Sequence, residues 1–278
     1  MKFGVNTFLW TASFEREHIP LLAPIREHGF DAVELTRFSW DNFPAAEIRR
    51  ETEKLGLGVT YCTAFGGRER SLVSDDPAVR AATIAYMKDA IESVASAGCH
   101  VLAGPFHSPV GYLPGRRRND DEWKWEVEAL RQLGEFAAGF DVTLGVEPLN
   151  RFESYFLNTA ADAARLCDEV NHPRVGVLYD TFHANIEEKS QYDAIRAVAR
   201  HLVHVHSCEN DRGTPGSGHV EWNDVFRALR EVNYSGHLVI ESFGFAIKEI
   251  SAAACIWRDL AASPEAIAWD GLKFLKSC

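Results

Sequence analysis

Eight short apolar runs, each followed by a segment with helical spacing, recur along this chain at intervals of roughly 30 to 35 residues, the size of one strand–helix unit. Most of the runs are continuous rather than alternating, which is typical of strands buried on both faces of a parallel sheet. The expected strands cover residues 2–8, 32–35, 58–63, 100–103, 142–146, 175–179, 202–205 and 237–240. The expected helices cover residues 19–28, 42–55, 76–97, 120–140, 160–170, 192–200, 222–232, 251–261 and 264–276.

This strict alternation, without a linker or a low-complexity break, predicts one parallel sheet. A chain of 278 residues with eight such units has the size of a closed (β/α)8 barrel. An open doubly wound sheet is the alternative, but it would carry a glycine-rich phosphate turn after the first strand, and the sequence NTFLW there contains no glycine. We therefore predict an α/β protein with a TIM barrel fold, in a single domain that spans residues 1–278.

The composition limits the partners and the compartment. A net charge of −11 repels phosphate backbones and disfavours a nucleic-acid partner. No stretch approaches the ~20 apolar residues of a membrane span, and the start, MKFGVNTFLW, does not resemble a signal peptide. The six cysteines form no C-x-x-C pair. The sequence thus predicts a cytoplasmic protein with reduced thiols, no membrane contact and no cysteine-based zinc site.

Four consecutive expected strands end in side chains that bind metal ions. They lie in the sequences GVEPLN, VLYDTFH, LVHVHS and LVIES, and they are Glu147, Asp180, His206 and Glu241. In a barrel these side chains converge at the C-terminal mouth, where such enzymes carry out their chemistry. Three clustered carboxylates would repel one another, and a moderately hard divalent cation such as Mn²⁺, Mg²⁺ or Co²⁺ relieves that repulsion. Asp180 taken alone is equally compatible with capping the next helix.

Further polar residues follow these strand ends on the loops that leave the barrel. Glu153, His183 and Arg212 each come three to six residues after one of the four ligands. Together they are typical of a ring that binds a polyol. His107, on the loop of residues 104–119 after the fourth strand, is a further candidate for contact with the substrate.

Two other polar features have simpler interpretations. His204 alternates with His206 and is expected to be structural rather than a ligand. The basic run Arg116–Arg118 is expected to be a solvated part of its loop. The alternative is that it binds an anionic substrate or a partner subunit.

The motifs around these residues resemble those of the ketose 3-epimerase family, typified by D-tagatose, D-psicose (allulose) and L-ribulose 3-epimerases, within the xylose isomerase-like superfamily. The resemblance runs over most of the chain, is strongest from Glu147 onward, and rests on EPLNRFES, DTFHANIEE, HVHSCENDRGTPGSGHVEW, VIESF and IWRDL. The chain departs from the family pattern at Pro148 and Leu149, which stand between Glu147 and Asn150, and in the tract GPFHSPVGYLPGRRR.

The resemblance implies an isomerase, a carbohydrate 3-epimerase that acts on a free ketose through a metal-bound cis-enediolate. It implies that the four strand-end residues bind Mn²⁺ or a similar ion and that the loop residues Glu153, His183 and Arg212 hold the sugar near its carbonyl. Because epimerisation needs a base on one face of C3 and an acid on the other, Glu147 and Glu241 are expected to fill these two roles. The expected partner is a small sugar, and relatives in the family suggest a homodimer or homotetramer.

Alternatives remain open at this point. An aldose–ketose isomerase, an inosose dehydratase or isomerase, and a lyase acting on 3-keto-glycosides all begin with proton removal beside a carbonyl, so the strand-end ligands do not separate them. An AP endonuclease of the endonuclease IV type shares the barrel. It is disfavoured because the third strand ends at Tyr61–Thr63 without a histidine and the net charge is acidic. A non-catalytic sugar-binding barrel is the third class.

Overall fold

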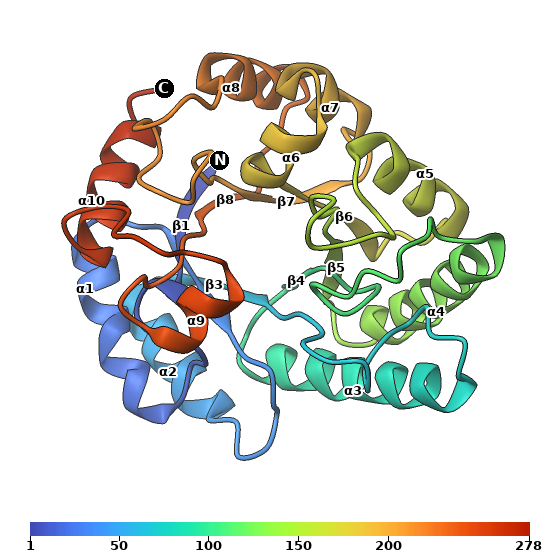
Figure 1. Ribbon diagram of the computed structural model, residues 1–278. Helices are drawn as coiled ribbons and strands as arrows, with labels where there is room; N and C mark the ends of the chain where they lie inside the picture. Colours follow the sequence, from blue (N-terminus) through green and yellow to red (C-terminus); the bar gives the residue numbers. More distant parts are fainter.

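The computed structural model of residues 1–278 contains eight parallel strands closed into a barrel, with β8 paired to β1. The predicted TIM barrel is confirmed, and Figure 1 shows the strands at the centre of a ring of helices. The strands are β1 (Lys2–Asn6), β2 (Ala32–Thr36), β3 (Gly58–Cys62), β4 (Val101–Gly104), β5 (Thr143–Val146), β6 (Val175–Asp180), β7 (Leu202–His206) and β8 (His237–Ile240).

Helices surround the barrel and follow each of its strands. The α-helices are α1 (Leu22–Glu27), α2 (Ala45–Leu55), α3 (Pro77–Ser96), α4 (Asp120–Ala138), α5 (Ala160–Val170), α6 (Thr181–Glu187), α7 (Gln191–Ala197), α8 (Trp222–Glu231), α9 (Lys248–Ala253) and α10 (Pro264–Leu275). Two 3₁₀ helices, η1 (Thr7–Leu9) and η2 (Arg16–Leu21), lie between β1 and α1. None of the helices combines the length and the apolar character that crossing a membrane requires.

Burial explains the sequence patterns that predicted these elements. Every residue of β2 and of β6 is buried, as expected of strands in a parallel sheet that is covered on both faces. On the outside, α8 buries Trp222, Val225, Phe226 and Leu229, which recur at the spacing of a single helical face. The barrel and the inward faces of its helices therefore share one packed core that supports the side chains at the strand ends.

Where the element boundaries differ from the predictions, local backbone chemistry gives the reason. β1 ends at Asn6 because the Asn6 side chain accepts a hydrogen bond from the backbone N–H of Phe8 and starts η1. α2 begins after Asn42, whose φ of 53° is left-handed. The helix expected at residues 251–261 is wrong: α9 starts earlier and ends before Cys255, which also has a left-handed φ of 53°.

Helix α4 carries a carboxylate into the core. Glu126 is fully buried, and neither of its side-chain oxygens has a hydrogen-bond partner. Burial raises the pKa of Glu126 well above its ordinary value of 4.5, because the charged form is poorly solvated there. The folded protein therefore holds a proton on Glu126 at pH values where the unfolded chain has released it.

This difference makes stability depend on pH with a definite sign. As the pH rises above 4.5, the unfolded state loses the proton and the folded state keeps it, so the contribution of Glu126 to the free energy of unfolding falls. Glu126→Gln removes this titration, and its advantage over the wild type should grow as the pH rises from about 4.5 toward the alkaline range. Urea unfolding at several pH values measures this difference in the free energy of unfolding. The exposed Glu128→Gln is the control for the loss of a charge alone. A difference independent of pH would contradict this assignment.

Candidate metal centre and substrate cavity

Strands β5 to β8 bring the four predicted ligands together at one end of the barrel. One ligand atom from each of Glu147, Asp180, His206 and Glu241 lies within 4.8 Å of the others, and all four residues are buried. Nδ1 of His206 lies 3.4 Å from Oε2 of Glu241 and 3.9 Å from a carboxylate oxygen of each of the other two acids. This Nδ1 is buried without a hydrogen-bond partner. A buried imidazole nitrogen facing three carboxylates is a donor set that fits a divalent cation.

Asp180 caps the next helix and also lies in the cluster, so the two interpretations of its sequence position are compatible. Its Oδ1 accepts a hydrogen bond of 2.7 Å from the N–H of Phe182 and so caps α6, while its Oδ2 lies in the cluster. Because α6 starts directly after the strand end, its first turn places His183 at the site as well. The sequence analysis missed α6, a helix of seven residues whose only clear signal is this cap.

The buried guanidinium of Arg212 partly offsets the charge of the cluster. Its Nη1 lies 2.8 Å from Oδ2 of Asp180 and 2.7 Å from Oε2 of Glu241. The guanidinium carbon lies 4.0 Å from the ring centre of Phe182 and 5.0 Å from that of Phe243. Burial disfavours the charged form, but the two carboxylates outweigh it and hold the pKa of Arg212 well above its ordinary value. Arg212 therefore remains a fixed positive charge beside the acids.

A second layer of polar residues inside the barrel orients His206. Nε2–H of His206 donates a 2.7 Å hydrogen bond to Oε1 of Glu34 on β2, which leaves Nδ1 to face the carboxylates. Glu34 also pairs with Nε2 of His204 at 2.7 Å and accepts hydrogen bonds from Asn6 and Thr60. This contact agrees with the interpretation of His204 as structural. The sequence analysis missed Glu34, although a carboxylate within a fully buried strand is itself a signal that partners must exist.

The surroundings of the two glutamates in the cluster push their pKa values apart. Burial raises the pKa of Glu147 well above its ordinary value, and the neighbouring Glu241 and Asp180 add to the shift. Burial acts in the same direction on Glu241, but His206 and Arg212 outweigh it, so the pKa of Glu241 is lowered. Two carboxyl groups with opposite shifts are the arrangement in which one holds a proton and the other accepts one.

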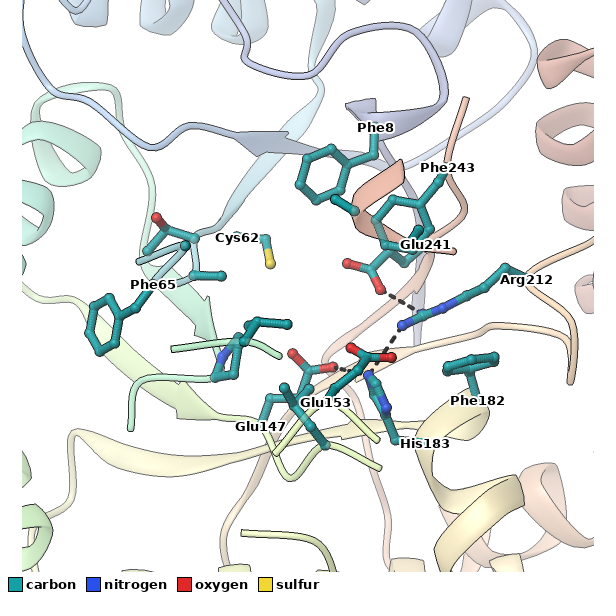
Figure 2. A pocket seen from close by; sticks show the side chains of 18 of the residues that line it. Phe8, Cys62, Phe65, Glu147, Glu153, Phe182, His183, Arg212, Glu241 and Phe243 are labelled. Atoms are coloured by element: carbon teal, nitrogen blue, oxygen red, sulfur yellow. Dashed lines mark hydrogen bonds and ion pairs between the residues drawn. The ribbon is translucent and has the colours of Figure 1, made fainter. Parts of the chain in front are cut away.

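A cavity of about 210 Å³ opens beside the cluster (Figure 2). Of the four clustered residues, Glu147 and Glu241 line it, together with Glu153, His183 and Arg212. The remaining wall is largely apolar, formed by Phe8, Phe38, Phe65, Val110, Leu149, Phe182, Phe243 and neighbouring residues. A small cavity with a few convergent polar groups and an apolar wall is typical of a site for a small organic molecule.

Comparison with known proteins identifies the family. The family model described as a xylose isomerase-like TIM barrel matches residues 22–278. A probable ketose 3-epimerase from Synechocystis sp. is 40% identical over 276 residues, which cover 99% of this chain and 96% of that protein. This chain belongs to the ketose 3-epimerase family.

Two further relatives support the assignment of this chain to the ketose 3-epimerase family. A D-psicose 3-epimerase from Agrobacterium fabrum is 32% identical and matches 97% of this chain and 94% of its own length. The crystal structure of a D-psicose 3-epimerase in the presence of D-fructose superposes with a TM-score of 0.92 at 30% identity, over 100% of this chain and 99% of that one. The predicted enzyme class, an isomerase of the carbohydrate 3-epimerase type, is confirmed by this similarity over the full length.

In the epimerase, the loop after β5 connects two of the predicted substrate contacts. The backbone N–H of Asn150 donates a 3.0 Å hydrogen bond to Nδ1 of His183, and the Asn150 side chain donates a 2.8 Å bond to Glu153. Burial, with Arg212 and His206 nearby, lowers the pKa of His183 well below its ordinary value. His183 is therefore a neutral imidazole whose Nε2 lies 3.1 Å from Nη2 of Arg212.

His107 lies behind the cavity wall rather than among the residues that line it. Its Nε2–H donates a 3.1 Å hydrogen bond to the carbonyl of Glu147, and its Nδ1 accepts one of 2.8 Å from the N–H of Ser108. Burial lowers the pKa of His107 to about 4. The structure thus places His107 as a support for the Glu147 backbone, and the direct contact with substrate remains a prediction.

The basic run of the long loop is engaged in ion pairs. Arg116 makes two hydrogen bonds to Glu122, of 3.0 and 2.8 Å, at the start of α4. Arg118 bonds Asp162 on α5 at 2.9 Å and the carbonyl of Phe156 at 2.6 Å. These two arginines tie the loop of residues 104–119 to its neighbouring helices, while Arg116 and Arg117 remain exposed, as expected of a solvated run.

Glu209, which the sequence analysis did not single out, organises the loop that carries Arg212. It is fully buried, and its two oxygens accept hydrogen bonds from the backbone of Val220 and Gly216 and from the indole of Trp222. One carboxylate thus holds together the segment between β7 and α8 and so helps to position Arg212 beside the cluster.

The contact between Glu34 and His206 should control the affinity for metal. Glu34→Gln leaves a single acceptor oxygen for the surrounding donors, so the orientation of His206 is lost. Loss of such an outer partner typically weakens metal binding about 10- to 100-fold. Isothermal titration with Mn²⁺ measures the effect, and the buried but remote Glu126→Gln is the matched control. An unchanged dissociation constant in Glu34→Gln would rule out this role.

Proposed function

We propose that this epimerase interconverts the C3 epimers of a free ketose, with Mn²⁺ as its ion and Mg²⁺ or Co²⁺ as the alternatives. Family membership supports the reaction. One structural observation supports the assignment of the reacting groups: of the four clustered residues, only Glu147 and Glu241 also line the cavity. They are therefore the two members that can contact both an ion and a substrate carbon.

The hydrogen on C3 is weakly acidic because it lies beside the C2 carbonyl. The ion, when held by the four strand-end residues, supplies Lewis acidity that lowers the cost of removing this proton. One glutamate takes the C3 proton as a base on one face and leaves an enediolate, and the other donates a proton to C3 from the opposite face. The bond electrons return to C3 as the new C–H bond forms, so the product is the C3 epimer. The two glutamates exchange roles in the reverse direction.

The other polar residues of the cavity hold the sugar. Arg212 and the neutral His183 present donors for O1 and O2, while Glu153 accepts a hydrogen bond from a hydroxyl or orients His183. Arg212 is held by Asp180 and Glu241, so its position is fixed before the sugar arrives. Such preorganised donors stabilise the negative charge that develops on the enediolate oxygens.

Deuterium exchange tests the proposed reaction. The Mn²⁺-loaded enzyme is incubated in D₂O with a panel of free ketoses, and the position and stereochemistry of the label are read by NMR. We expect deuterium at C3 in both C3 epimers. Label at C1 or C2 with an aldose product would replace the proposal with an aldose–ketose isomerase. Absence of exchange with every free ketose would contradict it and point to a modified substrate such as a 3-keto-glycoside.

Removing either reacting carboxylate should abolish turnover. Glu147→Gln and Glu241→Gln each delete one proton-transfer group, which typically contributes about 10²- to 10⁴-fold to the rate. Because both residues are also proposed ligands, turnover is compared at saturating Mn²⁺, with bound metal measured in parallel. Glu126→Gln serves as the control for changing a buried glutamate elsewhere. Substantial turnover by both site variants would refute the assignment.

A further inference from the structure

A thiol shares the space of the metal centre. Cys62 ends β3, is only 5% exposed, and lines the cavity. Figure 2 shows its sulfur pointing into the same open space as the carboxylates of Glu147 and Glu241. Its Sγ, Nδ1 of His206 and a carboxylate oxygen of Glu241 all lie within 4.8 Å of one another. No cysteine-based zinc site was expected from the sequence, because the six cysteines form no C-x-x-C pair.

Two of these three atoms already have the spacing of ligands around one small ion, and the sulfur lies within 4.8 Å of both. With bonds of about 2.3 Å to sulfur and about 2.0 Å to nitrogen, the ligands of a tetrahedral zinc ion lie about 3.5 Å apart. Nδ1 of His206 and Oε2 of Glu241 are already separated by 3.4 Å. The same Nδ1 is buried and has no hydrogen-bond partner, so it is available as a ligand.

The donor types differ from those of the four-residue cluster. Three carboxylates and one imidazole suit a moderately hard ion, whereas a thiolate with an imidazole and a carboxylate suits Zn²⁺ or Cd²⁺. Oxygen-preferring ions such as Mg²⁺ gain little from sulfur. One side of the centre therefore offers ligands that discriminate between two classes of ion.

We propose that Cys62, His206 and Glu241 form a second, overlapping site for a thiophilic divalent cation. Binding replaces the S–H bond with a sulfur–metal bond and releases the proton to solvent. Because the two sites share His206 and Glu241, they exclude each other, and an ion in the second site displaces the ion that the proposed reaction requires. The inference rests on the proposed ligand roles of His206 and Glu241 and adds to them a route for inhibition by zinc-like ions.

Cadmium titration tests the site without relying on activity. Thiolate–cadmium bonds absorb in the near ultraviolet, so Cd²⁺ is titrated into wild type, Cys62→Ser and Cys208→Ser. Cys208 is the matched control, since it is buried, and its Sγ lies 3.0 Å from Nη1 of Arg212 but outside the ligand group. We expect an absorption that saturates with one ion per chain in wild type and Cys208→Ser and is missing in Cys62→Ser. The difference between wild type and Cys62→Ser cancels any signal from the exposed Cys255 and Cys278.

Competition and affinity complete the test. Saturating Mn²⁺ should suppress the thiolate absorption. Loss of Cys62 should weaken Cd²⁺ binding at least about 10-fold, which is the effect that loss of an outer partner typically has. Absence of the absorption in wild type, its retention in Cys62→Ser, or its persistence under saturating Mn²⁺ would overturn the proposal. Cys62→Ala and circular dichroism separate loss of the ligand from misfolding. If wild type binds Mn²⁺ but Cd²⁺ produces no thiolate absorption, only the second site is refuted. If wild type does not bind Mn²⁺, the metal centre itself is refuted.

Discussion

Electrostatic repulsion among Glu147, Asp180 and Glu241 is the constraint on which the rest of the site depends. The closed parallel barrel places these carboxylates at the ends of β5, β6 and β8, on the same rim, where burial removes the water that would otherwise solvate them. Arg212 and His206 partly compensate the charge, but burial, together with Glu241 and Asp180, still raises the pKa of Glu147. In the proposed function a divalent cation completes the balance, so the acids that destabilise one another would also define where the ion binds.

Polar residues outside this cluster hold its members in position. Glu34 holds the far side of the His206 ring from within the barrel. Glu209 closes the loop that aims Arg212, and His107 supports the backbone of Glu147. The contacts of Glu34 and His107 join segments far apart in the sequence, which explains why the site requires the closed barrel rather than any single strand–helix unit.

The sequence was most informative where the same kind of residue recurs once in every strand–helix unit. The apolar runs located all eight strands, and a ligand at each of four successive strand ends predicted a cluster that the barrel does bring together. Short elements such as α6 and α9 were missed or misplaced because single residues, the Asp180 cap and the left-handed Cys255, decide their limits. Glu34 and Cys62 were not linked to the site because only the closure of β2 and β3 against the other strands brings them near His206.

Electron paramagnetic resonance of bound Mn²⁺ tests the central claim most directly, because it reports the ligands of the ion rather than the reaction. The account predicts one Mn²⁺ per chain with hyperfine coupling to a single histidine nitrogen. That coupling should change when histidine is labelled with ¹⁵N and disappear in His206→Asn. Coupling that survives this substitution, or the absence of stoichiometric Mn²⁺ binding, would contradict the assignment of the strand-end cluster as the metal centre.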